Sequence, residues 1–388
     1  MRPGRRRGWP WLVLACGLLA ATGAAGSTFD ATLPAWVRDD VAITARAYDR
    51  ALEGVKQLHT AVASFLEAPS ERTLRSAREA WRASRERYGP TEVFRFSDGP
   101  IDGDSAFAGH GGPENRINAW PVDEAYLDSV AGSPDGGLIL DRSLPMTRET
   151  LEHAHGSSDE AEVTLGFHAI EFLLWGQDRD TLTDGRRAFS DFSPGDPVRE
   201  RRRACLGILA TLLVEDVGAV AREWGPGAER YAARFVRLPA REALRRALTG
   251  AVTLSGFELA SERISVPLAT RSAEDEQSCF SDNTVRDIRS NIDGLALVLE
   301  GDDGAPGMLP LFHALDPALA GELRERLDEV RQRMLDIPEP FDAVILSAKD
   351  DPRRHRYQAL AGELIGLSGA LRRAGERAGV TVTIGGGG

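Results

Sequence analysis

Helical periodicity constrains the fold of this 388-residue chain more than any other feature of its sequence. Apolar residues recur at every third or fourth position, which places them on one face of an α-helix. Segments with this pattern cover residues 36–68, 71–88, 161–175, 199–224, 229–248, 287–299, 318–335 and 357–378. Alternation of apolar and polar residues, which is typical of strands, is scarce. We therefore predict an all-α protein.

The helical segments fall into two groups. The chain has the usual length of two domains, and we predict two antiparallel helical bundles packed together, over residues 28–190 and 196–378. The first bundle contains a Gly- and Pro-rich insert at residues 97–160, in which a small hairpin is an open alternative. An insert of that length in a compact domain usually has a function. The sequence Gly166-Phe167-His168 recurs faintly as Gly256-Phe257-Glu258, which is consistent with a duplication.

The N-terminus has the features of a secretory signal peptide, which we predict over residues 1–26. Four arginines among the first seven residues precede an apolar stretch from Trp9 to Ala21, which is short for a membrane span. Small residues follow and offer signal-peptidase sites. A lipoprotein signal at Cys16 is the alternative. Either signal would send the protein across the inner membrane to the periplasm or the cell surface.

Composition argues against two further classes of protein. Lys and Arg number 47 against 59 Asp and Glu, for a net charge of −12, so the chain lacks the cationic excess that nonspecific nucleic-acid binding requires. We expect no transmembrane helix in the mature chain, because no later segment reaches roughly 20 apolar residues. Cys205 and Cys279 would remain in an oxidising compartment, either as one disulfide or as two separate thiols.

The sequence Gly166-Phe167-His168-Ala169-Ile170-Glu171 carries the clearest chemistry. Positions i and i+3 share a helix face, so the imidazole of His168 and the carboxylate of Glu171 can converge on one ion. An imidazole with carboxylates suits iron, zinc or copper better than calcium. The alternative is an interior hydrogen bond between the two side chains. Ala169 and Phe172 stand where zinc-protease motifs of the H-E-x-x-H and H-x-x-E-H kinds need Glu and His, so both motifs are absent.

Three other polar segments are candidate parts of a site. Residues 89–96 place Glu92 and Arg95 among aromatic side chains, where burial is costly unless the charges pair with each other or with an ion. Residues 115–124 lie in the insert and are dense in hydrogen-bonding groups around Trp120. Residues 278–284 precede a helix, and Ser281 or Asp282 could simply cap it. Arg263 is either a surface charge or a cation of the site.

Together these segments resemble the imelysin family, and specifically its iron-regulated protein A branch. The resemblance is carried by residues 88–96 (YGPTEVFRF), 118–121 (NAWP), 166–171 (GFHAIE) and 279–284 (CFSDNT), and it runs from about residue 36 to 375. It implies a secreted or lipid-anchored bacterial protein with two helical bundles and a site at their interface. It also implies a role in iron uptake, with G-x-H-x-x-E as the metal-binding element and a partner protein that exchanges iron.

Carried over by position, the resemblance implies four metal ligands and a set of surrounding residues. The ligands would be His168, Glu171, Glu92 and Asp282. Residues around them, in walls or in contact with ligands, would be Arg95, Trp120, Arg263, Ser281 and Asn283. Iron is the expected metal, although such a ligand set would also accept zinc.

Three functions follow, in order of preference. The first is a non-enzymatic protein that binds iron or another transition metal between its bundles. The second is a metallopeptidase of the imelysin type that uses His168 and Glu171. The third is a binding module for a polymer or a partner protein, with residues 97–160 making the contacts.

Overall fold

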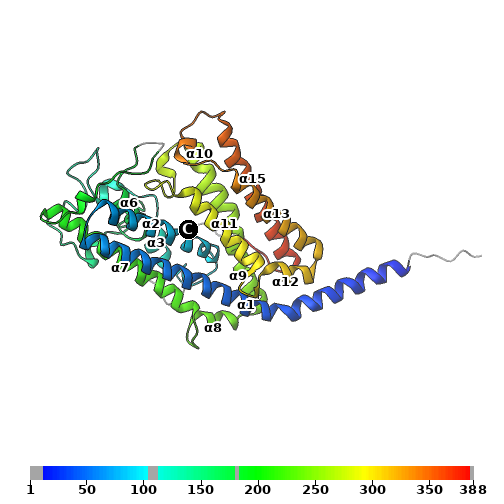
Figure 1. Cartoon of the computed structure of the whole chain (residues 1–388). Helices are drawn as coiled ribbons and strands as arrows, with labels where there is room; N and C mark the ends of the chain where they lie inside the picture. The colour runs from blue at the N-terminus through cyan, green and yellow to red at the C-terminus, as the bar shows by residue number, and fades with distance from the viewer. Residues whose placement is uncertain (1–11, 104–111, 180–182, 385–388) are drawn as a thin grey trace, which may run out of the picture.

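The structure is a computed structural model that describes residues 12–103, 112–179 and 183–384, with the backbone alone over residues 12–27. Within these ranges the regular secondary structure is almost entirely helical (Figure 1). Its two-stranded sheet is a short antiparallel hairpin of β1 (Gly301–Asp302) and β2 (Ala305–Pro306), in which Gly301 pairs with Pro306. The predicted all-α class is confirmed.

The first part of the chain forms one long helix and a set of shorter elements around it. These are α1 (Leu12–Glu67), α2 (Glu71–Tyr88), the 3-10 helix η1 (Gly89–Phe94), α3 (Pro113–Asn118), α4 (Glu124–Leu127), α5 (Arg148–Ala154), α6 (Gly166–Trp175), the 3-10 helix η3 (Phe189–Phe192) and α7 (Pro197–Trp224). The predicted start of α2 is confirmed, because the Ser70 hydroxyl accepts a hydrogen bond from the Thr73 amide in a capping box.

The second part begins after α7. It contains α8 (Tyr231–Val236), α9 (Ala240–Thr253), the π-helix η4 (Leu254–Ser265), α10 (Val266–Thr270), the 3-10 helix η5 (Ala273–Asp275), α11 (Thr284–Glu300), α12 (Met308–Leu315), α13 (Pro317–Leu335), α14 (Asp342–Ile345) and α15 (Pro352–Arg377). The single helix predicted over 229–248 is wrong, because Pro239 separates α8 from α9. A helical pattern does not reveal η4, since its π geometry shifts the spacing of side chains.

Helix α7 packs against α1, α3 and α6, so its contacts group it with the N-terminal helices although it follows the predicted boundary at 190–196. Among the described residues α7 is also the one helix long and apolar enough to span a membrane, and 56% of its apolar window is buried inside the protein. Its packing against α1 accounts for that apolar face.

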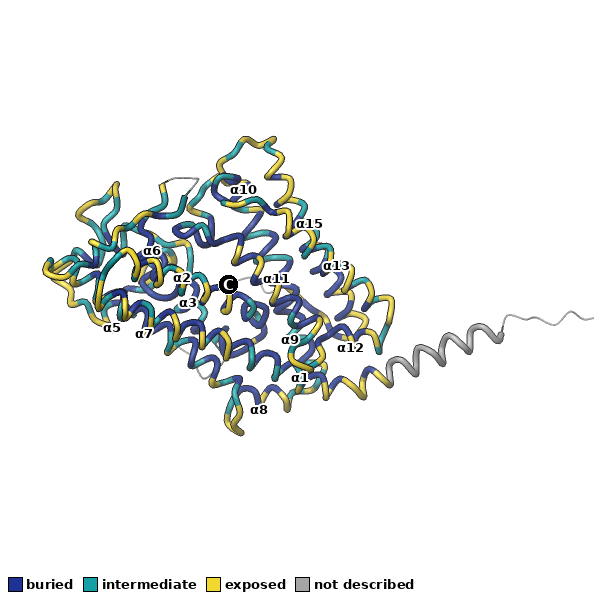
Figure 2. The backbone as a smooth tube through the Cα atoms, viewed as in Figure 1, coloured by how far each residue is buried: buried dark blue, intermediate teal, exposed yellow. Residues whose placement is uncertain are grey.

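Close packing at glycines brings η1 between the two groups of helices. Helix α11 is buried over most of its length (Figure 2) and lies against η1. A Cβ atom on Gly294 of α11 would lie 2.6 Å from the carbonyl oxygen of Pro90. A Cβ atom on Gly250 of α9 would lie 2.2 Å from the carbonyl oxygen of Val93. Only glycine allows this approach, and it places Glu92 deep in the interface.

Several sequence expectations concern segments outside the helices. The insert at 97–160 contains α3, α4 and α5 with one isolated bridge between Val130 and Ser133, so the structure has no hairpin in its described part. Cys205 and Cys279 are both free thiols, which excludes the disulfide alternative in this structure. The predicted signal peptide lies partly outside the described residues, and residues 12–26 belong to α1. Its cleavage and the lipidation of Cys16 stay predictions.

Candidate metal centre

Helix α6 holds the G-x-H-x-x-E sequence in the centre of the protein. Each of its ten residues is buried. Gly166 begins the helix with φ +81°, and a Cβ there would lie 2.5 Å from the carbonyl oxygen of Ile117. The glycine is therefore required by both the backbone conformation and the contact with α3. A helix fixed in this way gives His168 and Glu171 little freedom to move.

His168 and Glu171 form a hydrogen bond that uses one imidazole nitrogen and leaves the other without a hydrogen-bond partner. Nδ1 of His168 lies 2.8 Å from Oε2 of Glu171. The other oxygen, Oε1 of Glu171, accepts hydrogen bonds from the Ser281 amide at 3.0 Å and the Ser281 hydroxyl at 2.6 Å. Nε2 of His168 is buried and has no hydrogen-bond partner. Both Glu171 oxygens are thus occupied, whereas His168 offers a free nitrogen.

Burial sets the protonation of this pair. It lowers the pKa of His168 well below its usual range, and the charges of Arg85 and Arg263 lower it further. It also raises the pKa of Glu171 to about 8, against the Ser281 hydrogen bonds that favour the carboxylate. The imidazole is therefore neutral at physiological pH, which is the form that ligates metals. With a pKa of about 8, Glu171 is largely protonated at that pH, and it would lose this proton to become the carboxylate that usually orients a metal-binding histidine.

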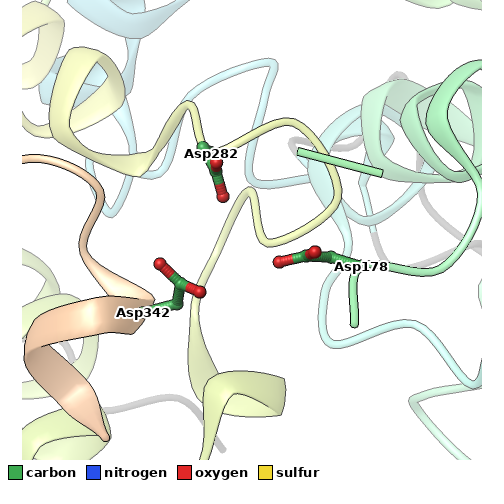
Figure 3. A group of neighbouring side chains, drawn as sticks. All are labelled: Asp178, Asp282 and Asp342. Atoms are coloured by element: carbon green, nitrogen blue, oxygen red, sulfur yellow. The ribbon is translucent and has the colours of Figure 1, made fainter. Parts of the chain in front are cut away.

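Asp282 lies in a different group from His168. One carboxylate oxygen of Asp282 lies within 4.8 Å of oxygens from Asp178 and Asp342. Figure 3 shows the three side chains pointing toward one another. Among the described residues this is the one group in which three metal-ligating side chains come so close. The four ligands carried over by resemblance therefore do not form one compact group.

The neighbours of Asp282 are also engaged away from the start of α11. Ser281 binds Glu171, and Asn283 is the N-cap of α11 without a side-chain capping bond. The side-chain amide nitrogen Nδ2 of Asn283 instead donates to Oδ1 of Asp287 at 3.2 Å. The Ser281 hydroxyl therefore donates to Glu171 and does not cap α11, which was the alternative interpretation of this segment.

Glu92 reaches the same buried region from η1 and pairs with Arg263 of η4. Oε2 of Glu92 accepts from Nη2 of Arg263 at 2.5 Å, and neither side chain is exposed. Nη1 of Arg263 donates to Asn291 at 2.6 Å. Oε1 of Glu92 is buried without a partner. Burial alone would raise the pKa of Glu92, but the charges of Arg263, Arg85 and Arg95 overcome it and lower that pKa to about 2.

Arg95 links this pair to the insert and to η4. Its Nη1 lies 3.3 Å from Glu114, 3.5 Å from Glu258 and 3.7 Å from Glu92. Glu258 also accepts from Arg263 at 3.2 Å. The π-helix thus turns both Glu258 and Arg263 toward η1, in keeping with the frequent use of π geometry at functional sites.

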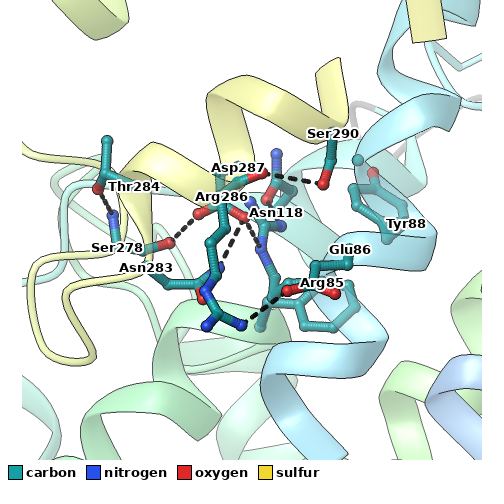
Figure 4. A network of polar contacts seen from close by, with 12 residues as sticks. Arg85, Glu86, Tyr88, Asn118, Ser278, Asn283, Thr284, Arg286, Asp287 and Ser290 are labelled. Atoms are coloured by element: carbon teal, nitrogen blue, oxygen red, sulfur yellow. Dashed lines mark hydrogen bonds and ion pairs between the residues drawn. The ribbon is translucent and has the colours of Figure 1, made fainter. Parts of the chain in front are cut away.

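Arg85 of α2 is a central residue that the sequence did not single out. Its guanidinium is fully buried, with Nε 3.1 Å from Oδ1 of Asp287 and Nη1 2.5 Å from Oδ1 of Asn118. Figure 4 shows Arg85 and Asn118 meeting Asp287 beside the start of α11. Nη2 of Arg85 and Nδ2 of Asn118 are buried donors with no partner. The interior therefore has spare donors as well as spare acceptors.

A pocket of about 470 Å³ opens beside this network. Arg95, Asn118 and Glu258 belong both to the network and to the pocket wall, and Trp120 is part of that wall. Its other lining residues include the acidic side chains Glu114, Glu160, Glu262 and Asp275. The pocket wall therefore carries several carboxylates and touches the network at Arg95, Asn118 and Glu258, whereas His168, Glu171 and Glu92 are not among its lining residues.

The model of the family described as imelysin, peptidase family M75, matches residues 44–371. The chain belongs to the imelysin family. It is 28% identical over 316 residues to iron-regulated protein A of Synechococcus elongatus, covering 78% of this chain and 75% of that protein. The resemblance identified in the sequence is thereby confirmed.

Solved structures share the imelysin fold. The crystal structure of a putative iron-regulated protein A precursor from Parabacteroides distasonis matches with a TM-score of 0.65 and 17% identity, over 89% of this chain and 95% of that one. An imelysin-like protein from Psychrobacter arcticum matches with a TM-score of 0.63 and 17% identity, over 92% and 98%. At this identity the likeness concerns the fold.

The residues of this imelysin centre that sequence reasoning missed are mostly charged partners. Arg85 and Asp287 occupy ordinary amphipathic helices, and their sequence gives no sign that they are buried. Glu258 did carry a signal, because it stands in Gly256-Phe257-Glu258 where His168 stands in Gly166-Phe167-His168. Both residues face the interface, Glu258 through Arg263 and Arg95.

Proposed function

We propose that this imelysin-family protein binds iron, or another transition metal, as a cargo held between its two groups of helices. The observation that carries the proposal is the buried, unpartnered Nε2 of His168, which Glu171 orients from the other side of the ring. Leaving such a nitrogen without a partner costs free energy unless a ligand completes it. Histidines that ligate metals usually hydrogen-bond through their other ring nitrogen to such a carboxylate, as His168 does to Glu171.

His168 and Glu92 are the proposed protein ligands. Oε1 of Glu92 is the unpartnered acceptor on the η1 side, and Arg85 and Arg263 act electrostatically on both Glu92 and His168. Imidazole with carboxylate favours a transition metal over calcium or magnesium. Glu171 has both oxygens in hydrogen bonds, so its role here is to position His168.

Each of the buried arginines around Glu92 is paired with acidic side chains, so these cations do not exclude a metal ion from the site. Arg85 pairs with Asp287, Arg263 with Glu92 and Glu258, and Arg95 with Glu114, Glu258 and Glu92. Nη2 of Arg85, Nε of Arg263 and Nδ2 of Asn118 are unpartnered donors, and they suit an oxyanion that accompanies the metal. The cargo would enter by the acidic pocket beside Arg95.

The iron context rests on the relatives. The Synechococcus protein is named as iron-regulated, and so is the Parabacteroides precursor. Export by the segment at 1–26 and iron exchange with a partner protein are parts of the same proposal. The peptidase alternative lacks both zinc-protease motifs, and no contact or cavity among the described residues favours the polymer-binding alternative.

The test is metal binding by a chain that begins at residue 27, first stripped with a chelator. Calorimetry with ferric citrate, ferrous and zinc ions would be paired with elemental analysis of the separated protein. We expect about one metal per chain, binding abolished in His168→Gln, and binding 10–100-fold weaker in Glu171→Gln. The control is His313→Gln, which alters an exposed histidine of α12.

Folding must be separated from binding in this test. Near-ultraviolet circular dichroism and thermal unfolding of each variant would identify a variant that fails to fold. Equal metal affinity in the wild type, His168→Gln and Glu92→Gln would overturn the proposal. So would the absence of binding by the wild type to every metal and chelate offered.

A further inference from the structure

A second pocket, of about 460 Å³, lies among the N-terminal helices. Its wall is formed by the loop after α4, the end of α6, the segment around η3 and the first turns of α7, and α6 and α7 lie close together in Figure 1. Asp191 is the one acidic residue that the structure describes in this wall, and its basic residues are Arg179, Arg186, Arg187 and Arg202. We call it the arginine pocket. Its charge is opposite to that of the pocket beside Arg95, where acidic side chains predominate.

The two exposed arginines of the wall already have partners. Arg179 donates to the side-chain oxygen of Gln177 and Arg186 to the hydroxyl of Thr183, both at 2.7 Å. The two buried arginines are therefore the ones that decide what the pocket can bind.

Arg187 and Arg202 are buried and share one buried carboxylate. Their side chains are each 8% exposed, and that of Asp128 is not exposed at all. Arg202 binds both carboxylate oxygens of Asp128, from Nε at 2.7 Å and from Nη2 at 2.9 Å. Arg187 donates to the same group once, from Nη1 to Oδ2 at 2.8 Å. A single buried carboxylate therefore serves two buried cations, and the charge of Asp191 acts on both.

Arg187 keeps a donor without a partner. Its Nε is buried and makes no hydrogen bond. Burial lowers the pKa of Arg187 in spite of the opposing charge of Asp128. At Arg202 burial is outweighed by the hydrogen bonds and the charge of that carboxylate, which raise the pKa. Asp128 thus compensates Arg202 more fully than Arg187, and a buried donor on such a cation suits an anionic acceptor.

Gly176 leaves room beside this donor. It lies in the same wall, at the end of α6, with φ +73°. A Cβ atom on Gly176 would lie 3.4 Å from Nε of Arg187, and the three atoms nearest to that position all belong to Arg187. Because glycine has no side chain, an acceptor atom fits beside Nε in the wall that both residues line.

We propose that the arginine pocket binds the carboxylate or phosphate group of a small organic anion, and that Arg187 contacts this group through Nε. The planar guanidinium offers N–H donors whose geometry matches both oxyanions. A cavity of this volume is typical of sites for small molecules, and it exceeds what the anionic group alone would fill. The residues of this pocket differ from those of the His168 centre, so the two proposals stand or fall separately.

The experiment is calorimetry and thermal unfolding of the metal-free protein from residue 27 onward, at constant ionic strength. The probes are glycerol 3-phosphate and citrate, which carry the two oxyanions, and glycerol, which is the uncharged counterpart of the first. We expect one anion per chain for at least one of the two anions, and no binding of glycerol. Arg187→Lys should weaken the binding roughly 10–100-fold, because lysine keeps the charge but loses the charge-assisted hydrogen bond from Nε. The preference between the two anions identifies phosphate or carboxylate as the group that is bound.

Ala131→Glu gives an independent test, because it leaves the buried arginines intact. Ala131 is an exposed residue of the wall, so an added carboxylate there should weaken binding by repulsion and leave the Tm without ligand unchanged. Ala318→Glu, exposed on α13, should bind as the wild type does, and His168→Gln should keep the whole response, which separates this pocket from the iron centre. The absence of saturable binding of either anion at about 10 mM, tenfold above a millimolar Kd, would overturn the proposal. So would wild-type affinity in Arg187→Lys or, where near-ultraviolet circular dichroism shows that this variant is unfolded, wild-type affinity in Ala131→Glu.

Discussion

Replacing Glu92 by Gln tests the electrostatics of the inter-bundle site through stability alone. The pKa of Glu92 is lowered from 4.5 to about 2, which corresponds to about 3 kcal/mol at neutral pH at roughly 1.4 kcal/mol for each tenfold change in the equilibrium. Glu92→Gln also leaves Arg263 buried with Glu258 as its remaining acidic partner at 3.2 Å. Breaking a buried pair in this way usually costs about 3–5 kcal/mol. We expect a loss of about 3 kcal/mol at pH 7.

The stability difference between the wild type and Glu92→Gln depends on pH in a direction that the pKa shift determines. The folded-state pKa lies below the unfolded one, so the contribution is complete above about pH 4.5 and is lost as the pH falls toward 2. Urea unfolding of both proteins, with a chelator present, would measure the difference at each pH. The difference in unfolding free energy should decrease as the pH falls from about 4.5 toward 2.

The matched control is Glu86→Gln, which removes an exposed ion pair with Arg286 at 2.9 Å. Such pairs contribute about 0–1 kcal/mol. The reasoning is refuted if Glu92→Gln stays within 0.5 kcal/mol of the wild type at pH 7, or if its deficit does not diminish on acidification.

Three further predictions concern other parts of the fold. Gly166→Ala should destabilise the protein by more than about 1 kcal/mol, because φ is +81° and the new Cβ would meet Ile117; Gly321→Ala in α13, where a Cβ meets nothing within 4 Å, should not destabilise in the same urea assay. Asp128→Asn should cost about 3–5 kcal/mol in urea unfolding, because this unexposed carboxylate pairs with both Arg187 and Arg202; a loss under 1 kcal/mol would contradict the structure. Cys205 should resist alkylation in the native protein and react fully in urea, as followed by mass spectrometry, because it is buried and its thiol pKa is raised; rapid native labelling would be inconsistent with its burial.

Periodicity was sufficient to predict the helical class and most long helices, because a buried face recurs with the helical repeat whatever it packs against. It failed where local geometry departs from the α-helix. The π-helix η4 alters the repeat, and Pro239 divides one apparent helix into α8 and α9. Periodicity also could not assign α7 to a bundle, since an apolar face does not show which other helix packs against it.

The candidate site was predictable to the extent that local sequence determines it. The i, i+3 spacing of His168 and Glu171 places both on one helix face, and the structure has them hydrogen-bonded. What the sequence could not supply is which distant charges meet. Arg85 reaches Asp287 across 202 positions of the chain, and the Glu92–Arg263 pair spans 171. Only the tertiary fold determines such contacts.

The segment Ser281-Asp282-Asn283 shows how three adjacent side chains can serve three different environments. Asp282 has φ +55°, a left-handed conformation that aspartate tolerates better than most residues. With the backbone turned there, Ser281 faces Glu171, Asp282 faces Asp178 and Asp342, and Asn283 faces Asp287. A substitution that removes the turn would therefore disturb the Ser281 contact with Glu171, and with it the position of His168, whereas Asp282→Asn keeps a residue suited to the turn and removes only the charge. Loss of metal binding at His168 in a β-branched variant such as Asp282→Val, with binding kept in Asp282→Asn, would therefore report on the backbone rather than on the carboxylate.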